Sequence, residues 1–185
     1  MNSFLPAQKP KNLHNLDVKA FAKAHMHLEG DTPLAEFERL AEDCSGEVTG
    51  HVSWSAQGEI DPDLSGKDAA WLHLEAKATV PLTCQRCLQP VPVDLMIEQD
   101  FRFVADEATA LAEDDESEED LLVLEDNFDL MALIEDELLM SMPLVPMHPT
   151  CLSEQVPTSP EEAAAMSEAK PNPFAVLASL KTRKH

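Results

Sequence analysis

The sequence predicts an α+β protein in which an antiparallel β-sheet, or a partly closed barrel, packs against a few helices. Three observations predict this class. Residues 47–104 alternate apolar and polar side chains with a period of two, as half-buried strands do. Apolar residues at helical spacing flank this region on both sides. The chain has 185 residues, of which 44% are hydrophobic, so it is long enough to build one core.

The N-terminal part is predicted to hold two helices and a short strand. Residues 1–14 are polar and unpatterned and are expected to form a flexible arm, while residues 15–152 are expected to form a single domain. A first helix begins near Asn15, and "HMHLEG" then alternates like a short strand. In "DTPLAEFERLAEDC", Thr32 is predicted to cap a second helix with Pro33 at its first position.

Three longer segments are predicted to be the main strands of the sheet: "EVTGHVSWSAQGEI", "AAWLHLEAKATVPLT" and "VPVDLMIEQDFRFVA". The turn formers of "DPDLSGKD" join the first two segments. In the second segment the polar or amphipathic side chains share one face, whereas Leu72, Leu74, Ala76 and Ala78 share the other; the first face holds Trp71, His73, Glu75 and Lys77.

A long acidic segment follows the strands. No Lys or Arg occurs between Arg102 and Lys170, and residues 103–169 contain 19 of the acids in a chain whose formal net charge is -22. Residues 105–120 are too acidic to bury and are predicted to form a mobile loop. The segment disfavours binding of nucleic acid and favours a cationic partner. A solvated loop without a partner is the alternative interpretation.

The chain is predicted to return to ordered structure after the acidic loop. "LLVLE" is expected to be a short strand, and Asp126 or Asn127 to cap a helix that runs to about Met142, where Pro143 and Pro146 follow. Spacing predicts that this helix buries Leu130, Met131, Ile134, Leu138 and Met142. The same spacing turns Asp129, Glu135 and Asp136 toward water.

The last segment, residues 153–185, is predicted to be a flexible tail. Its end, "PNPFAVLASLKTRKH", carries apolar residues at nearly helical spacing, so a short docking helix over 173–181 and a disordered tail remain alternatives. No signal peptide and no stretch of ~18 apolar residues is found, which predicts a cytoplasmic protein without a membrane partner. In that reducing compartment the cysteines are expected to be thiols or metal ligands.

The motif with the most chemical content is the CxxC of "VPLTCQRCLQP". Cys84 and Cys87 are predicted to lie in a turn between two strands, where no helix dipole activates a redox thiol. Such a turn lets two thiolates converge on one Zn²⁺ ion, and "MHPTC" supplies His148 and Cys151 at the same spacing. A Cys3His zinc site is therefore one interpretation. Two half-buried thiols without a metal is another, and redox chemistry is the third. Cys44, at a helix end, is expected to be a small apolar residue.

No residue pattern predicts catalysis. The chain has 5 Gly and contains no phosphate-binding loop, and "GHVSWSAQG" lacks the spacing of a nucleophile elbow. The protein is therefore expected not to be an enzyme. A zinc-dependent or thiol enzyme would require a metal with an open coordination position.

Three motifs in this order, "LTCQRCLQPVPVDL", "DLMALIEDELLMSMPLVPMHPTC" and "KPNPFAVLASLK", resemble the bacterial YceD family of large ribosomal RNA subunit accumulation proteins. The resemblance implies a factor that supports synthesis, processing or stability of the large-subunit (23S) ribosomal RNA. It implies no catalytic residues. The family's characteristic positions correspond to Cys84, Cys87, Glu135, Glu137, Pro143, Pro146, His148, Cys151, Asn172, Pro173 and Phe174.

Charge and resemblance together give two functional hypotheses. In the first, the acidic segment binds a basic ribosomal protein or large-subunit assembly factor, and contact with ribosomal RNA is direct or indirect. In the second, the protein is a small zinc-binding module that contacts RNA through the sheet face around Trp71 and Arg86, with Lys67, Lys77 and Arg102 adding positive charge.

Overall fold

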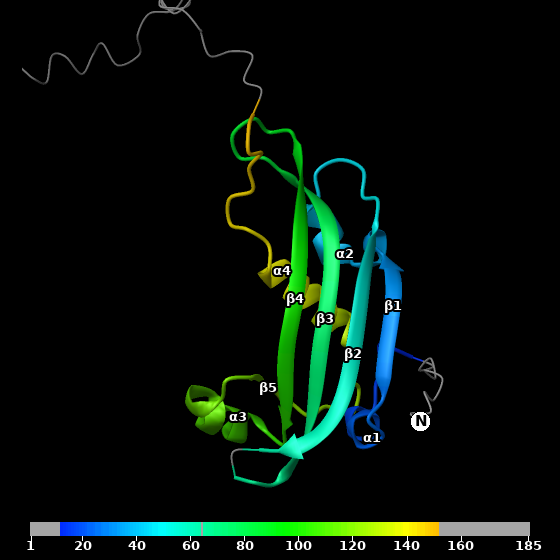
Figure 1. Ribbon diagram of the computed structural model, residues 1–185, viewed down its shortest axis with the longest axis vertical. Helices are drawn as coiled ribbons and strands as arrows, with labels where there is room; N and C mark the ends of the chain where they lie inside the picture. Colours follow the sequence, from blue (N-terminus) through cyan, green and yellow to red (C-terminus); the bar gives the residue numbers. More distant parts are fainter. Residues whose placement is uncertain (1–11, 64, 152–185) are drawn as a thin grey trace, which may run out of the picture. The chain divides into compact units, whose positions relative to one another are not determined.

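The computed structural model describes residues 12–63 and 65–151, and the fold below is that of the described residues up to Pro149. Five strands form one open sheet in the order β1-β2-β3-β4-β5 (Figure 1). They are β1 (His27–Pro33), β2 (His51–Pro62), β3 (Asp68–Thr83), β4 (Pro90–Val104) and β5 (Asp120–Val123). The predicted α+β class is confirmed, and the sheet is open rather than closed into a barrel.

The sheet is mixed because its last strand runs parallel to its neighbour. β1 to β4 pair antiparallel in sequence order, whereas β5 pairs parallel with β4. A parallel pair needs a crossover connection of a dozen or more residues. The acidic segment provides it through α3 (Glu107–Glu113) and the 3-10 helix η2 (Asp114–Glu116), with Asp106 accepting a hydrogen bond from the Thr109 N–H at 2.8 Å. The segment predicted to be a mobile loop over 105–120 therefore contains two short helices.

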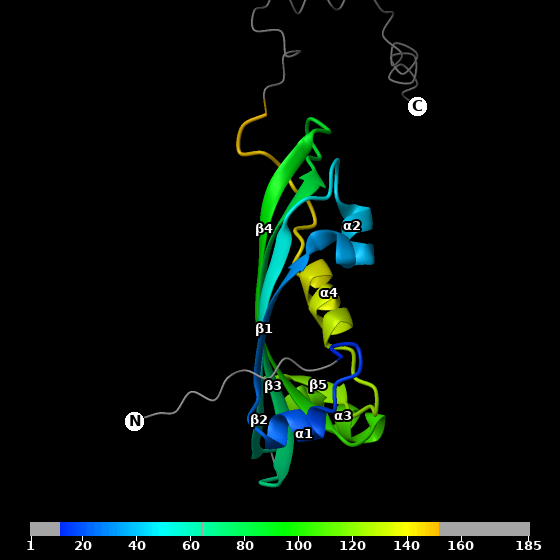
Figure 2. The same cartoon turned by 90° about the vertical axis from the view of Figure 1, so that its right-hand side faces the viewer.

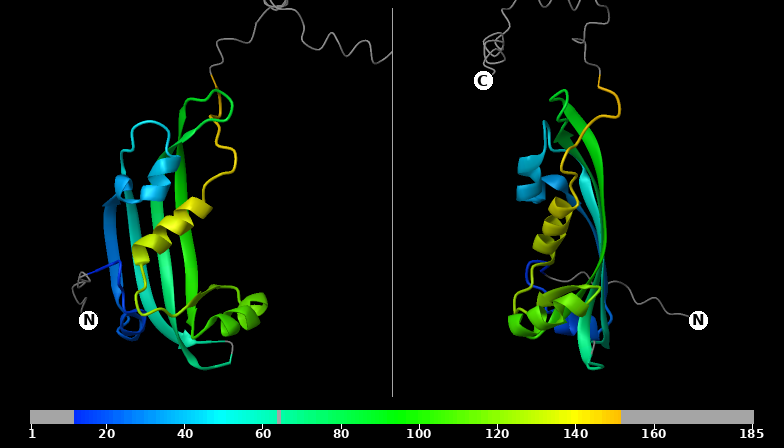
Figure 3. Two further views of the ribbon diagram at one scale, coloured as in Figure 1. Left: turned by 180° about the vertical axis from the view of Figure 1, so that it is seen from behind. Right: turned by 90° about the vertical axis from the view of Figure 1, so that its left-hand side faces the viewer.

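One face of the sheet carries the core. α1 (Val18–Lys23), α2 (Glu38–Asp43) and α4 (Leu130–Met140) all lie on the same side of the strands (Figure 2 and Figure 3). The predicted alternation of β3 is confirmed, since its apolar set is buried toward these helices. The buried side chains of the sheet include Leu28, Val52, Trp54, Ala56, Leu72, Leu74, Val80, Leu95, Ile97, Phe101 and Phe103.

The first helix packs closely on β2. Asp17 caps α1 by accepting a hydrogen bond from the Ala20 N–H at 2.9 Å, and Phe21 and Ala22 of this helix are buried. Gly58 of β2 lies directly under this helix. A Cβ atom at Gly58 would lie 2.5 Å from the Phe21 ring, so the helix is seated where the strand has no side chain.

The second helix begins later than predicted. Thr32 belongs to β1, opposite Val52, and its hydroxyl accepts a hydrogen bond from the Trp54 indole N–H at 3.0 Å. It is therefore a partner of a buried indole and not a helix cap. A 3-10 turn, η1 (Leu34–Glu36), separates the strand from α2. Cys44 follows the helix, and its thiol donates to the Leu40 carbonyl at 3.3 Å.

The helix after β5 also begins later than predicted. Asp129, not Asp126 or Asn127, caps α4 by accepting a hydrogen bond from the Ala132 N–H at 2.9 Å. The inward stripe is confirmed for Leu130, Ile134 and Leu138, while Met131 and Met142 are half-buried. The prediction that Glu135 faces water is wrong, because this carboxylate is buried between α4 and α2.

Two residues assigned to the N-terminal arm take part in the fold. The Leu13 carbonyl accepts a hydrogen bond from the Leu130 N–H at 3.0 Å, and His14 Nδ1 lies 3.0 Å from an Asp129 carboxylate oxygen. The predicted helix over 173–181 lies outside the described residues. Within the described ranges, no helix is both long and apolar enough to cross a bilayer.

Candidate metal centre

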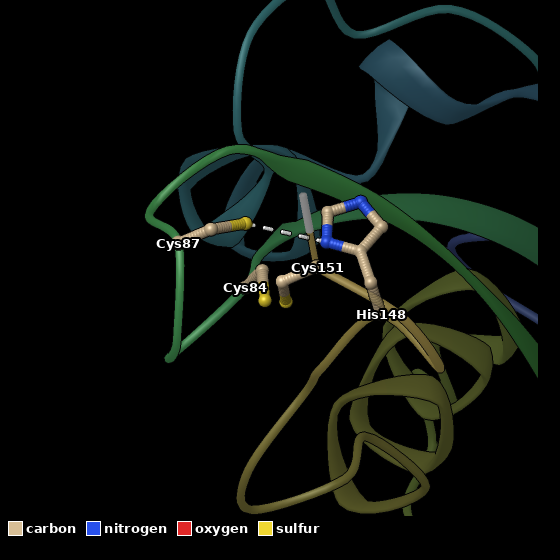
Figure 4. A group of neighbouring side chains, drawn as sticks. All are labelled: Cys84, Cys87, His148 and Cys151. Atoms are coloured by element: carbon tan, nitrogen blue, oxygen red, sulfur yellow. Dashed lines mark hydrogen bonds between the residues drawn. The ribbon is translucent and has the colours of Figure 1, made fainter. Parts of the chain in front are cut away.

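The turn between β3 and β4 holds the CxxC motif, as predicted. The Cys84 N–H donates to the Gln89 carbonyl and the Leu88 N–H to the Cys84 carbonyl, both at 2.9 Å. Leu88, directly after Cys87, has a φ of 60°. That left-handed conformation is uncommon outside glycine. In Figure 4 the Cys87 sulfur points toward the His148 ring, and the Cys84 sulfur lies near that of Cys151.

The segment that follows α4 is attached to this turn. The Gln85 N–H donates to the Pro146 carbonyl at 2.9 Å, and an Arg86 guanidinium nitrogen lies 3.9 Å from the Met147 sulfur. His148 then reaches the hairpin, where its Nδ1 lies 3.4 Å from the Cys87 sulfur (Figure 4). Residues separated by some sixty positions in the sequence are thus neighbours in the fold.

A backbone carbonyl fixes the tautomer of His148. Its Nε2 lies 3.0 Å from the Pro90 carbonyl oxygen, which can only accept a hydrogen bond. Nε2 therefore carries a proton, and Nδ1 is the ring nitrogen that faces the Cys87 sulfur. Metal-binding histidines are held in this way, with the nitrogen remote from the metal donating to a carbonyl or carboxylate.

The environment of Cys84 favours its thiolate. Burial opposes the charged form, but the backbone N–H groups of Cys87, His148 and Arg86 and the His148 side chain outweigh this effect and lower the pKa of Cys84 to about 5. The thiolate is the form of cysteine that binds metal ions. No helix begins at either cysteine of the motif, so hairpin N–H groups stabilise the charge in place of a helix dipole.

The structure brings the four predicted ligands together. The ligand atoms of Cys84, Cys87, His148 and Cys151 all lie within 4.8 Å of one another. Cys151 follows His148 by three residues, so the Cα atoms of these two residues can be at most ~11 Å apart. Around a tetrahedral zinc with Zn–S bonds of ~2.3 Å, neighbouring ligand atoms are ~3.8 Å apart. Small side-chain rotations would therefore complete the coordination shell.

The donor set fits zinc better than other common metals. Thiolates together with an imidazole suit Zn²⁺, whereas Mg²⁺ and Ca²⁺ require oxygen ligands. Four protein ligands fill a tetrahedral shell and leave no position for water or substrate. The arrangement can therefore fix the hairpin and the segment after α4 in one geometry, and it offers no open position for catalysis.

The cations of the alternative RNA surface do not gather in one place. Arg102 is 1% exposed, with its guanidinium bonded to Glu113 and Glu119. Lys67 lies in the turn that precedes β3, whereas Arg86 lies in the turn that follows it. A strand rises about 3.3 Å per residue, so Trp71 is ~40 Å from the end of β3 nearest Arg86. The prediction of a joint basic surface around Trp71 and Arg86 is wrong for this reason.

The sequence predicts neither of two polar clusters that the structure contains. Glu135 accepts hydrogen bonds from the N–H groups of Arg39 and Leu40 at the start of α2, at 2.8 and 3.2 Å. Glu135 is also one of the family's characteristic positions, and these hydrogen bonds give its side chain a structural role. On the other face of the sheet, ligand atoms of His73, Glu75 and Glu98 lie within 4.8 Å of one another. Only the strand register, which the sequence does not give, places Glu98 opposite Glu75.

Comparison with known proteins identifies the family. The family model described as "Large ribosomal RNA subunit accumulation protein YceD" matches residues 72–181. A protein of that name from Haemophilus influenzae is 43% identical over 184 residues, which cover 95% of this chain and 99% of the relative. No solved structure matches. The family match includes the CxxC hairpin, α4 and the segment with His148 and Cys151, and the chain belongs to the YceD family.

Proposed function

We propose that this protein is a ribosome-biogenesis factor that supports synthesis, processing or stability of the 23S ribosomal RNA by binding a basic ribosomal protein or assembly factor. The name of its relative, a large ribosomal RNA subunit accumulation protein, supports the RNA-related role. The observation that supports a protein partner is the charge distribution: 19 acids and no Lys or Arg between Phe103 and Ala169. The factor would act in the cytoplasm by binding and not by catalysis.

Electrostatics favours a basic protein over naked RNA. Residues 107 and 114–116 of α3 and η2 expose their carboxylates to water, and the described part of the acidic segment has no cation of its own. Such a surface repels phosphate groups and accelerates encounter with a cationic protein. A basic protein held in this way would be kept from premature contact with RNA until the RNA competes for it.

The partner can be tested with purified components. The protein is immobilised and exposed to salt-extracted proteins of the large ribosomal subunit in one experiment, and to naked 23S ribosomal RNA in another. A specific basic protein is expected to bind at about 0.05 M salt and to dissociate as ionic strength rises, because exposed charges are screened. Retention of the RNA without any basic protein would overturn this proposal.

We further propose that Cys84, Cys87, His148 and Cys151 hold a structural Zn²⁺. The carbonyl-fixed imidazole and the lowered pKa of Cys84 support this assignment, together with the 4.8 Å grouping of the ligand atoms. The ion would hold the segment after α4 against the hairpin, where Gln85 and Pro146 already share a hydrogen bond. The proposed ion has a structural role, and the ribosomal function does not require it to take part in a chemical step.

Elemental analysis and a spectroscopic probe test the metal site. Purified protein is expected to contain one zinc per chain, and Cys84→Ser and Cys151→Ser to lose it, whereas the matched control Cys44→Ser, which alters a thiol at the end of α2, retains it. Co²⁺ in place of zinc should give the absorption bands of a tetrahedral thiolate site. Absence of zinc, with no Co²⁺ spectrum after reduction of the thiols, would contradict the assignment.

A further inference from the structure

The outer face of the sheet is the face opposite α1, α2 and α4. Its side chains alternate with the buried ones along β1 to β4, and none of the helices just named covers them (Figure 2 and Figure 3). The register places two cations, the exposed Lys77 and the buried Arg102, among many carboxylates. The acids of this outer face are Glu29, Asp31, Glu59, Asp61, Glu75, Asp94, Glu98 and Asp100.

Strand pairing forces like charges together on this face. Glu75 lies directly opposite Glu98, and Ser55 separates Glu75 from Glu29 in the same cross-strand row. Directly opposed like charges destabilise a sheet. His73 offsets part of the repulsion, since its imidazole lies 2.6 Å from an Asp100 oxygen and 3.6 Å from a Glu75 oxygen. The remaining carboxylates form an arrangement that a cationic partner would stabilise.

The same row contains a hollow suited to a long basic side chain. It has a volume of about 680 Å³. Ser53 and Ser55 of β2 form a low floor, because their side chains are short. Glu29 and Asp31 of β1 stand on one side, and Glu75 and Lys77 of β3 stand on the other. A lysine or arginine that entered from a partner would meet carboxylates on both sides and hydroxyl groups below.

We infer that the outer face of β1 to β4 is the docking surface for an extended, Lys- and Arg-rich segment of a basic protein. The inference rests on the proposed function, because it names the surface on which the basic partner binds. Charge complementarity selects the occupant. In an extended segment, alternate side chains share one face about 6.8 Å apart, which is also the spacing of Glu29 and Asp31 along β1 and of Glu98 and Asp100 along β4. A phosphate backbone would meet repulsion at the same positions.

The test compares two triple variants with the same change of net charge. The first, Glu29→Gln/Glu75→Gln/Glu98→Gln, neutralises the outer face. The second, Asp114→Asn/Asp115→Asn/Glu116→Gln, neutralises η2 in the acidic segment. Binding of a fluorescent peptide of alternating lysine and serine is measured by anisotropy at low salt. The outer-face variant is expected to lose about tenfold in affinity, as for three exposed ion pairs, and the η2 variant less than about twofold.

Stability measurements exclude unfolding as the cause of lost binding. Because Glu75 and Glu98 repel each other, the outer-face variant is expected to have an unchanged or raised melting temperature. Equal losses of affinity in both variants would mean that net charge alone attracts the peptide, and a loss only in the η2 variant would place docking on the acidic segment. Either result overturns the inference and leaves the proposed partner intact. Failure of large-subunit proteins to bind the unaltered chain would refute the proposed function itself.

Discussion

Glu135 shows how one buried carboxylate can organise the end of another helix. A helix start leaves N–H groups without partners, and α2 has no side-chain cap of its own. The Glu135 carboxylate, 11% exposed, accepts from two of these N–H groups and forms an ion pair of 2.8 Å with the Arg39 guanidinium. Glu135 of α4 therefore caps α2, which is the role that the spacing predicted for Thr32.

Replacing Glu135 by Ala is expected to destabilise the fold by about 2–3 kcal/mol, because two N–H groups and a guanidinium lose their acceptor in a part-buried site. Urea unfolding followed by circular dichroism measures the change. Asp136→Ala is the matched control, because Asp136 pairs with the same arginine but is 51% exposed, and it is expected to cost less than about 1 kcal/mol. Equal effects of the two variants would disprove the capping role.

His73 is expected to titrate above the usual range of histidine. The hydrogen bond to Asp100 is the main cause of its raised pKa, with burial opposing it and Glu75 adding to it. Glu75, Glu98 and Asp100 are the charged groups that face it from β3 and β4. The stabilisation from a raised pKa is complete below the unfolded value of about 6.5 and is lost as pH rises through the folded value. Proton NMR titration measures the pKa, and Asp100→Asn should lower it; an unchanged pKa would contradict the pairing.

At the scale of elements, Arg102 fixes the crossover between β4 and β5. Its side chain donates to Glu113 at 2.7 Å and to Ser117 at 2.8 Å, and it pairs with Glu119 at the end of the crossover. The guanidinium also lies 5.9 Å from the Trp71 ring centroid. An acid at the end of α3 and an acid just before β5 therefore share one buried cation, which ties the acidic crossover to β4.

Arg102→Met is expected to release this crossover. Removal of one member of a buried ion pair leaves the other charges uncompensated and typically costs about 3–5 kcal/mol. Amide hydrogen exchange over 106–119 should accelerate strongly, while exchange in the central strands changes little. Lys77→Met, which alters an exposed cation of the same sheet, serves as the control and should shift stability by less than about 0.5 kcal/mol. Uniform acceleration across the whole sheet would refute a local role.

At the scale of the whole molecule, one face of the sheet carries the core and the opposite face is rich in carboxylates. The apolar face is covered by α1, α2 and α4 (Figure 2 and Figure 3), while the outer face carries the acids of β1 to β4. With a formal net charge of -22, repulsion among carboxylates opposes folding. Burial of apolar side chains in the core must therefore outweigh the repulsion among carboxylates for the isolated protein to fold.

Salt is expected to stabilise the isolated protein. Raising ionic strength from about 0.01 M to about 0.1 M shortens the Debye length from about 30 Å to about 10 Å and screens the repulsion. The melting temperature should rise by a few degrees in a calorimetric scan, and it should rise less in the outer-face triple variant. A complex with a basic partner should respond in the opposite direction. A melting temperature of the free protein that falls with salt would contradict this account.

The parts of the fold that depend on local pattern were predictable from the sequence. The alternation along β3 and the turn at Cys84 and Cys87 follow from period and turn chemistry, and the spacing of His148 and Cys151 matched a metal ligand set. The acceptor role of Glu135 and the burial of Arg102 were not predictable, because each depends on which elements pack together. The acidic outer face likewise required the register of neighbouring strands.

The sequential strand order has a consequence for synthesis of the chain. Each of β2 to β5 pairs with the strand made just before it, so the sheet can grow from β1 onward as the chain leaves the ribosome. Capping of α2 must wait for Glu135, and the metal ligands are complete only when Cys151 has emerged. If the proposed zinc binds, it can do so only after the β3–β4 turn and the segment after α4 have both been made, so metal binding follows formation of the sheet.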